Sequence, residues 1–255
     1  MPDTRWLALL HLKRRLSVDA ATLSASDDAR MESALRAAQA EIEAATGRRY
    51  VPIQSTVSHW ALPGQRVLPL RDDLLELVSV TDADGTVYLP EDVTCDAANL
   101  ALNEPARFDG GAVRVSGLWA YHPAPSLAFR PSGDSLAAPV TSSALTLTVL
   151  NAAGADTWGD MPRFTTGHLL RIESELVRVT GVESNTLVVR RGENGTTAAS
   201  HAAGAGVEVF SPSFTAEALG LRLASWLYRE PDAEHGREWP SGIASGIDRL
   251  RRLRV

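Results

Sequence analysis

Residues 31–50, MESALRAAQAEIEAATGRRY, contain the clearest indication of the fold. Apolar side chains recur there at helical spacing, and Gly47 stands where a helix would end in the left-handed conformation. Upstream, Ser26 followed by Asp27 and Asp28 supplies an N-terminal cap and first-turn acids. We therefore predict a helix from about residue 26 to Gly47. Its apolar face consists of Met31, Ala34, Leu35, Ala38, Ile42 and Ala45.

A shorter helix is predicted before it, capped by Thr4 and with Trp6, Leu9, Leu10 and Leu16 on its apolar side. The charges at the start of the chain follow a short apolar stretch, which is the reverse of a secretory signal peptide. No run reaches the roughly 18 to 20 apolar residues that a membrane span needs. We expect a soluble protein made inside the cell.

After Gly47 the hydrophobic period changes from helical to alternating, which predicts short strands and a small antiparallel sheet. The Asp84-Gly85 dipeptide between two of the strands is a strong hairpin signal. The expected strands cover residues 57–61, 67–70, 77–81, 86–89, 99–102 and 112–119.

Residues 122–141 contain four prolines, which favours an extended linker over a strand or a helix. Residues 142–211 then show closely spaced short strands typical of an all-β sandwich or barrel. We predict four regions: a core of helices followed by a small β-sheet over 1–121, the linker, the inserted β domain, and C-terminal helices over 212–255 that complete the core and end in a docking tail.

The C-terminal region reads as two helices. Residues 213–229 are apolar on almost every side, so this helix needs cover from its own neighbours or from other subunits. The last helix is amphipathic and ends in arginines, a form suited to docking on a partner or to a plain surface. Its apolar side chains are Ile243, Ile247, Leu250 and Leu253.

Composition narrows the class of protein. The chain has 255 residues, 44% of them hydrophobic, and a net charge of −6, so whole-molecule attraction to nucleic acid is not expected. Residues 51–140 hold 11 acidic and 5 basic side chains, an excess of carboxylates that repels phosphate groups. The lone Cys95 excludes an intrachain disulfide and a thiolate zinc site; we expect it to be buried or half-buried.

No catalytic or metal-binding constellation stands out. The six histidines never lie four residues apart. Residues 241–246 lack the pattern of a nucleophile elbow, and residues 191–197 lack the lysine and following helix of a phosphate loop. The acids of residues 71–109 lack calcium-loop spacing and are interpreted as a solvated face. We expect no enzyme, no cofactor and no metal.

The order of these features resembles the tailed-phage head-tail connector family, also called adaptor or head completion proteins. The match covers about residues 1–121 and 213–255. It rests on the short and the longer N-terminal helices and on these strings: Ala44-Ala45-Thr46-Gly47-Arg48-Arg49-Tyr50, Leu68-Pro69-Leu70, Leu77-Val78-Ser79-Val80, Asp84-Gly85 and Leu221-Arg222-Leu223-Ala224-Ser225-Trp226-Leu227-Tyr228-Arg229-Glu230.

This resemblance implies an α+β protein, a helical bundle with a small antiparallel β element. It implies a ring, commonly of twelve copies, beneath the portal protein in the neck of the virion, with a stopper or tail-completion protein on its other side. Packaged DNA would pass through without specific binding, and no membrane is involved. The chain would be made in the host cytoplasm.

The resemblance also implies two contact surfaces. In this family the C-terminal segment embraces the portal, which assigns that contact to Ile247, Leu250, Arg251, Arg252, Leu253, Arg254 and Val255. We assign subunit contacts within the ring to the late helix, at Leu223, Trp226, Leu227 and Tyr228.

The inserted β domain departs from the shorter family members and leaves the outer shape of the ring open. Its string over residues 190–201 looks like a β module that recurs in phage structural proteins. Two alternatives remain: a DNA-binding protein that uses both basic ends, and a glycan-binding or decoration protein built on the β domain. Trp158 and His168 are the candidate glycan contacts, although Trp158 also suits core or loop packing.

Overall fold

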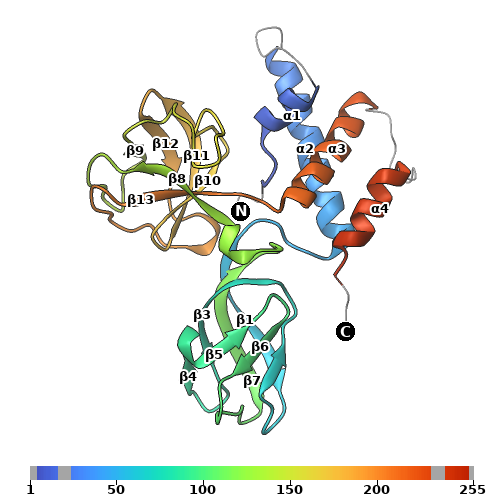
Figure 1. Cartoon of the computed structure of the whole chain (residues 1–255), viewed down its shortest axis with the longest axis vertical. Helices are drawn as coiled ribbons and strands as arrows, with labels where there is room; N and C mark the ends of the chain where they lie inside the picture. Colours follow the sequence, from blue (N-terminus) through green and yellow to red (C-terminus); the bar gives the residue numbers. More distant parts are fainter. Residues whose placement is uncertain (1–4, 17–23, 231–238, 253–255) are drawn as a thin grey trace. The chain divides into compact units, whose positions relative to one another are not determined.

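The computed structural model describes residues 5–16, 24–230 and 239–252 (Figure 1). These residues contain four α-helices and several antiparallel sheets, which confirms the α+β class. They divide into two compact units, one formed by Met1–Gly47 with Ser126–Val255 and the other by Arg48–Pro125. None of the helices in the described ranges has the length and hydropathy to cross a bilayer.

The long N-terminal helix, α2, spans Ala25–Thr46. Ser24 is its cap: the Ser24 hydroxyl accepts the N–H of Asp27 at 3.3 Å, and the Asp27 carboxylate accepts the N–H of Ser24 at 3.1 Å. This reciprocal pair starts the helix two residues before the expected cap at Ser26, because Asp27 suits the third helical position. Gly47 ends the helix with φ of 65°, as predicted.

The segment before α1 differs from its prediction. Helix α1 spans Leu9–Leu16, and Trp6 lies ahead of it. The backbone N–H groups of Trp6 and Leu7 both donate to Oε1 of the buried Gln39, at 2.6 and 3.0 Å. This side-chain acceptor on α2 holds the segment outside the helix. The expected cap Thr4 lies outside the described residues.

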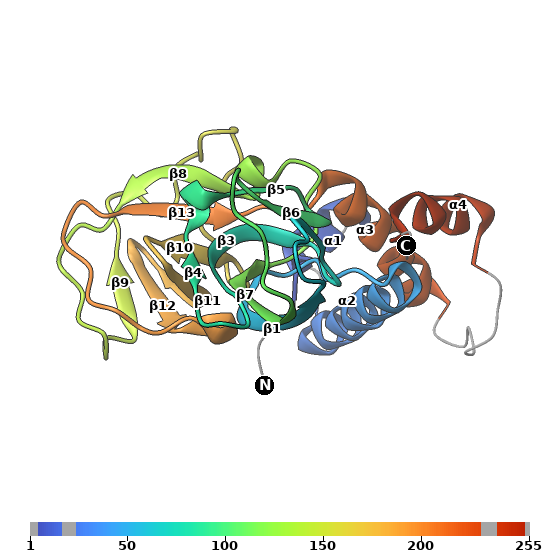
Figure 2. The same ribbon diagram turned by 90° about the horizontal axis from the view of Figure 1, so that it is seen from below.

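Two further helices complete this side of the unit: α3, Phe214–Arg229, and α4, Ser241–Leu250. Figures 1 and 2 both show α2, α3 and α4 side by side. Glycines permit close packing around α3, because a Cβ on Gly220 would lie 2.7 Å from Leu7, ahead of α1, and one on Gly246 in α4 would lie 2.8 Å from Leu219 in α3. The late helix is thus covered in large part by its own chain.

The unit Arg48–Pro125 contains two sheets where one was expected. The four-stranded sheet has the order β1-β7-β3-β4, and the three-stranded sheet has the order β2-β6-β5. The predicted hairpin at Asp84-Gly85 is confirmed by the pairing of β3 with β4. The strands are β1 Ile53–Ala61, β2 Val67–Pro69, β3 Leu74–Thr81, β4 Val87–Tyr88, β5 Val93–Cys95, β6 Asn99–Leu102 and β7 Gly111–Trp119, with a 3-10 turn η2 at Pro90–Asp92.

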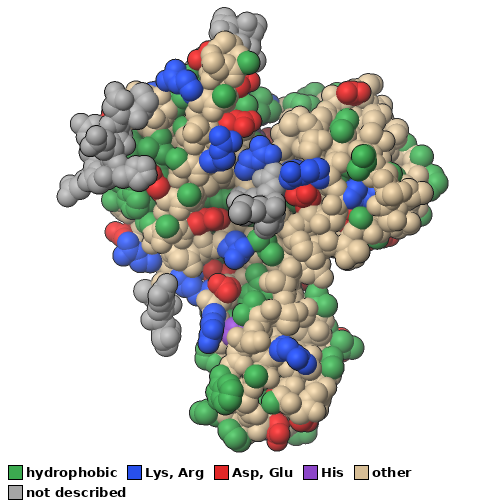
Figure 3. All heavy atoms as spheres, turned by 180° about the vertical axis from the view of Figure 1, so that it is seen from behind, with side chains coloured by type: hydrophobic (Ala, Val, Ile, Leu, Met, Phe, Trp, Pro, Cys, Tyr) green, Lys and Arg blue, Asp and Glu red, His purple; other side chains and the backbone are tan. Residues whose placement is uncertain are grey.

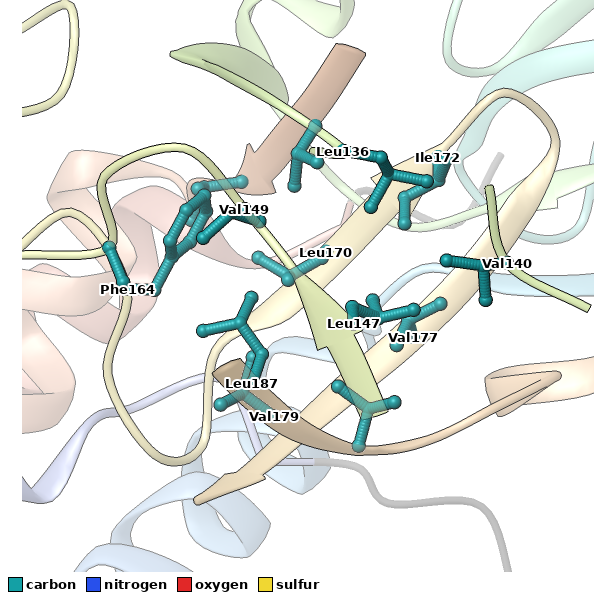
Figure 4. Packing of buried hydrophobic residues seen from close by; sticks show 14 residues of the cluster. Leu136, Val140, Leu147, Val149, Phe164, Leu170, Ile172, Val177, Val179 and Leu187 are labelled. Atoms are coloured by element: carbon teal, nitrogen blue, oxygen red, sulfur yellow. The ribbon is translucent and has the colours of Figure 1, made fainter. Parts of the chain in front are cut away.

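The second β region forms one six-stranded antiparallel sheet in the order β8-β13-β10-β11-β12-β9. A bridge between Leu136 and Val149 joins the ends of the two outer strands and closes the sheet into a barrel. Its interior is filled by aliphatic side chains and Phe164 (Figure 4). The elements are η3 Pro125–Leu127, β8 Phe129–Ser135, β9 Thr146–Thr148, β10 Leu169–Ile172, β11 Glu175–Glu183, β12 Thr186–Arg190, η4 Glu193–Gly195 and β13 Gly206–Phe210.

The prediction that residues 122–141 contain no strand is wrong, because β8 lies within them and pairs with β13. Pro131 is tolerated there for two reasons. It lies opposite Glu208 at a register shift, and β8 has a full strand neighbour on one side. A proline that lacks its N–H fits an outer strand or a bulge.

Candidate functional site

The predicted portal-docking side chains of α4 face the interior of the chain. Ile247 and Leu250 are 1% and 5% exposed, and α4 packs on α2 and α3. Periodicity identified this apolar face correctly, but the chain's own helices cover it. In this conformation neither side chain presents surface to a partner, so this part of the docking assignment is corrected.

The basic end of the tail is only partly described. Arg251 is exposed and lies 3.4 Å from Asp248, whereas Arg252 is half-buried and its backbone N–H donates to the Thr46 carbonyl at 2.9 Å. The remaining members of the assignment, Leu253, Arg254 and Val255, lie outside the described residues.

The four predicted subunit contacts on α3 differ in their exposure. Leu223 is 0% exposed and belongs to the chain's own core, so it is removed from the contact surface. Trp226, Leu227 and Tyr228 are half-buried and keep some surface for a neighbour. The guanidinium of Arg30 lies 5.1 Å from the centre of the Tyr228 ring and covers part of that surface.

Three exposed apolar side chains of the unit Arg48–Pro125 lie along the connection from β1 to β2: Trp60 in β1, Leu62 in the turn and Val67 at the start of β2. We name them the β1–β2 patch. Trp60 and Leu62 are 71% and 65% exposed. The turn between β1 and β2 is closed by the N–H of Gln65 donating to the Leu62 carbonyl at 3.0 Å. Figure 3 shows hydrophobic side chains at the surface of this unit.

Sequence reasoning missed the β1–β2 patch, although a signal was present in the alternation of His59, Trp60 and Ala61 along the predicted strand. His59 and Ala61 are buried, and successive side chains of a strand point to opposite faces, so Trp60 between them must point outward. Trp60 also pairs in register with Ala112, whose small side chain leaves the indole uncovered.

The barrel carries a second apolar surface on the long loop between β9 and β10. Leu150, Trp158 and Met161 are exposed there, beside a groove of about 290 Å³ lined by Phe164 and Val182 among others. Asp134 fixes the start of the loop by accepting the N–H groups of Leu150 and Asn151. The other anchors of this loop include ion pairs of Arg163 with Asp134 and of Arg130 with Asp156.

The two candidate glycan contacts differ in their settings. Trp158 is 56% exposed, so it is no core residue, and the Arg130 guanidinium lies 4.9 Å from its ring centre. His168 is half-buried on the wall of a cavity, and its Nδ1 lies 3.4 Å from the backbone N–H of Thr165.

The glycine-bearing loop after β12 has a structural explanation. Glu175, whose side chain is 0% exposed, receives two hydrogen bonds of 2.7 Å from the Arg191 guanidinium and further bonds from the N–H groups of Gly192 and Ala199. His201 Nε2 lies 2.8 Å from the same carboxylate. Burial alone would raise the pKa of Glu175, but these donors lower it to about 2. The string over residues 190–201 therefore supplies the hydrogen-bond partners of one buried carboxylate of the barrel, Glu175. We name this set of contacts the Glu175 network.

Two further sequence expectations concern reactive groups. Cys95 is exposed, so the expectation that it is buried or half-buried is wrong; it lies at the end of the three-residue strand β5. Within the described ranges no three His, Cys, Asp or Glu side chains come together as ligands for a metal ion.

The comparisons with known proteins are sparse. No family model matches the chain, and no curated protein matches it. Among solved structures, a chain of the neck of an empty GTA (gene transfer agent) particle, computed with C6 symmetry, aligns with a TM-score of 0.39 and 14% identity. The alignment covers 98% of this chain and 91% of that one.

Proposed function

We propose that this chain is a structural protein of a phage-like particle, located in the neck between head and tail. Copies of the chain form a ring that joins the portal to stopper or tail-completion proteins and extends the DNA channel. The four helices supply the bundle at the core of the ring. The sequence resemblance described above supports this role, which requires no catalysis, cofactor or metal.

The observation that carries the proposal is the β1–β2 patch. A tryptophan that is 71% exposed beside a leucine that is 65% exposed forgoes hydrophobic free energy in an isolated chain. Exposed apolar groups gathered on one element mark protein interfaces, and tryptophan is enriched among the residues that dominate binding energy. A chain that assembles through this patch buries both side chains.

The charge of the same unit is consistent with a channel or outer wall. Residues 48–125 contain 10 acidic and 6 basic side chains. Because carboxylates repel phosphates, such a wall lets DNA slide and does not hold it.

The portal contact is proposed for the end of the chain beyond α4. Of the described tail residues, Arg251 offers an exposed guanidinium, while Ile247 and Leu250 serve the chain's own core. The guanidinium group of arginine can donate two parallel hydrogen bonds to a carboxylate on a partner. Residues 253–255 complete the proposed segment.

The test is assembly. We expect the purified chain mixed with portal to give ring complexes by native mass spectrometry and cryo-EM. The double substitution Trp60→Ser and Leu62→Ser should abolish them and leave the circular dichroism unchanged. The matched control is Leu145→Ser, which changes an equally exposed leucine on the barrel and should assemble normally. A wild-type chain that stays monomeric beside portal, or a double variant that assembles fully, contradicts the proposal.

The exposure of Trp158 favours one second candidate, a glycan-binding or decoration role for the barrel. An exposed indole gives an apolar plane on which a sugar ring can stack, with Asp160 and Arg130 nearby as polar partners. Quenching of tryptophan fluorescence by oligosaccharides, lost in Trp158→Ala, would establish this role. Unchanged fluorescence across a panel of oligosaccharides would eliminate it.

A further inference from the structure

Strand β1 forms one outer edge of the four-stranded sheet in the unit Arg48–Pro125. It pairs with β7 along its whole length, from Ile53 opposite Trp119 to Ala61 opposite Gly111, in one unbroken register. Within the described ranges no second strand pairs with it. Alternate backbone N–H and C=O groups of an edge strand point away from its neighbour. The nine-residue strand therefore presents a row of donors and acceptors to which another strand can bond.

The sequence of β1, IQSTVSHWA, lacks the features with which proteins protect such an edge. Natural edge strands are very short, or they carry charged side chains, proline or a bulge. β1 has no Asp, Glu, Lys, Arg or Pro and shows no register shift. Its first six residues, Ile53–Ser58, are exposed or half-buried, and we name this stretch the β1 edge.

The other outer strands are protected. β4 has two residues and is followed by the 3-10 turn η2, which consists of Pro90, Glu91 and Asp92. In the three-stranded sheet, β2 and β5 have only three residues each. The outer strands of the barrel, β8 and β9, are joined at their ends by the bridge between Leu136 and Val149. Among the outer strands that the structure describes, β1 alone is both long and unprotected, which indicates that this edge is used.

A second copy of β1 has the geometry to occupy this edge. In an antiparallel pair, two opposite residues either both direct their backbone groups toward the partner strand or both direct them away. Alternate residues of one strand face the same edge, so two β1 strands must pair even-numbered with even-numbered residues. Placing Thr56 opposite Thr56 meets this condition and sets Gln54 opposite Ser58. It also leaves Pro52, which has no N–H, beyond the paired stretch.

The side chains brought together in this register are compatible. His59 and Ala61 are buried, so the even-numbered side chains of the β1 edge lie on the outer face of the sheet. Hydroxyl pairs such as Thr56 with Thr56 are favourable across strands, and no like charges meet. The Ser55 carbonyl accepts the indole N–H of Trp119 at 2.9 Å, and a carbonyl oxygen has a second lone pair for a strand bond.

We propose that two copies of this chain pair through their β1 edges in antiparallel orientation. The resulting dimer joins their four-stranded sheets into one continuous sheet. Main-chain hydrogen bonds supply the affinity in this kind of strand addition. The pairing also protects the edge from unrelated strands. The inference goes beyond the proposed function, because it concerns the free chain in the absence of portal.

The experiment measures the mass of the full chain by analytical ultracentrifugation over a range of concentrations, without portal. We expect a reversible equilibrium between monomer and dimer. Moderate salt should favour the dimer, because each chain has a net charge of −6 and salt screens the repulsion. Hydrogen exchange at alternate amides of the β1 edge should become slower as the concentration of the chain rises.

Charge substitutions at Thr56 test the register. Thr56→Lys and Thr56→Glu each place like charges opposite one another on an exposed face, so each should raise the dissociation constant of the dimer at least about tenfold. An equal mixture of the two variants should recover dimers, because opposite charges then face each other. The matched control, Thr146→Lys, changes an exposed threonine of the barrel strand β9 and should dimerise like the wild type.

Three outcomes overturn the proposal. The first is a wild-type chain that stays monomeric, and the second is a Thr56→Lys variant that dimerises like the wild type. The third is slower exchange at the β1 edge only after portal is added, which would assign the edge to a strand of the portal. A chain that assembles on portal but never dimerises contradicts this inference alone, whereas a chain that dimerises but does not assemble contradicts the proposed function alone.

Discussion

Glu175 shows how single residues hold the barrel together, because one carboxylate satisfies Arg191, two backbone N–H groups and His201. Glu175→Gln leaves the Arg191 guanidinium, whose side chain is 4% exposed, without its counter-charge. Breaking one side of a buried pair costs about 3–5 kcal/mol. Urea unfolding should show this loss. Glu193→Gln removes one charged partner of the half-exposed Arg190 and should cost less than about 1 kcal/mol. Equal effects of the two substitutions would contradict the stabilising role of the Glu175 network.

Acid should destabilise the barrel in two separate pH ranges. The pKa of His168 is about 4 in the folded chain against 6.5 ordinarily, so its contribution is present above pH 6.5 and is lost as the pH falls toward 4. The pKa of Glu175 is about 2 against 4.5, so its contribution is lost between pH 4.5 and 2. Urea midpoints measured against pH should flatten in the upper window for His168→Gln and in the lower window for Glu175→Gln. Curves that keep the wild-type shape would contradict this assignment.

Gly117 in β7 is required by close backbone packing. A Cβ at this position would lie 2.6 Å from the carbonyl oxygen of Glu76 and 2.7 Å from Leu74. A backbone oxygen cannot swing aside as a side chain can, so Gly117→Ala should cost about 1–3 kcal/mol in denaturant unfolding. Gly206→Ala, in a strand with no atom within 4 Å of the added Cβ, is the control and should change stability little. A stable Gly117→Ala variant would show that β3 shifts freely.

At the scale of elements, the barrel gives the inserted β domain wider bounds than the residues 142–211 predicted from the sequence. Residues 142–211 omit β8 and the core side chain Leu136, which is 1% exposed. We expect a fragment of residues 126–212 to unfold cooperatively by circular dichroism and a fragment of residues 142–211 to remain unfolded or aggregate. If the shorter fragment folds equally well, β8 is dispensable. If neither folds, the barrel depends on the helices.

The packing of α4 on the core predicts a difference between two C-terminal truncations. Truncation after Ser245 would remove Ile247 and Leu250 from the core, at about 1.5–3 kcal/mol for each buried side chain, so we expect a clearly lowered Tm. Truncation after Arg252 leaves α4 complete and should keep the wild-type Tm while weakening attachment to portal-bearing capsids. Full attachment by that shorter chain would place the portal contact elsewhere.

For the whole molecule, the net charge of −6 sets the response to nucleic acid. We expect duplex DNA to bind without saturation at physiological salt in fluorescence anisotropy, because few phosphates can be neutralised at once. Saturable binding with a steep salt dependence would favour the DNA-binding alternative over a channel wall.

Local patterns determined the elements that depend on near neighbours. Periodicity and a glycine stop located α2, the apolar run located α3, and Asp84-Gly85 located its hairpin, since caps, turns and amphipathic faces involve residues a few positions apart. The apolar face of α4 was also readable in this way.

Tertiary structure alone decided what those faces contact. The sequence could not show that α2 and α3 cover Ile247 and Leu250, or that β13 recruits the proline-bearing β8. It also could not bring Glu175, Arg191 and His201 together, or Arg5 against Arg178. The physical reason is that periodicity records which side of an element is apolar, whereas burial and pairing depend on segments that approach only when the whole chain has folded.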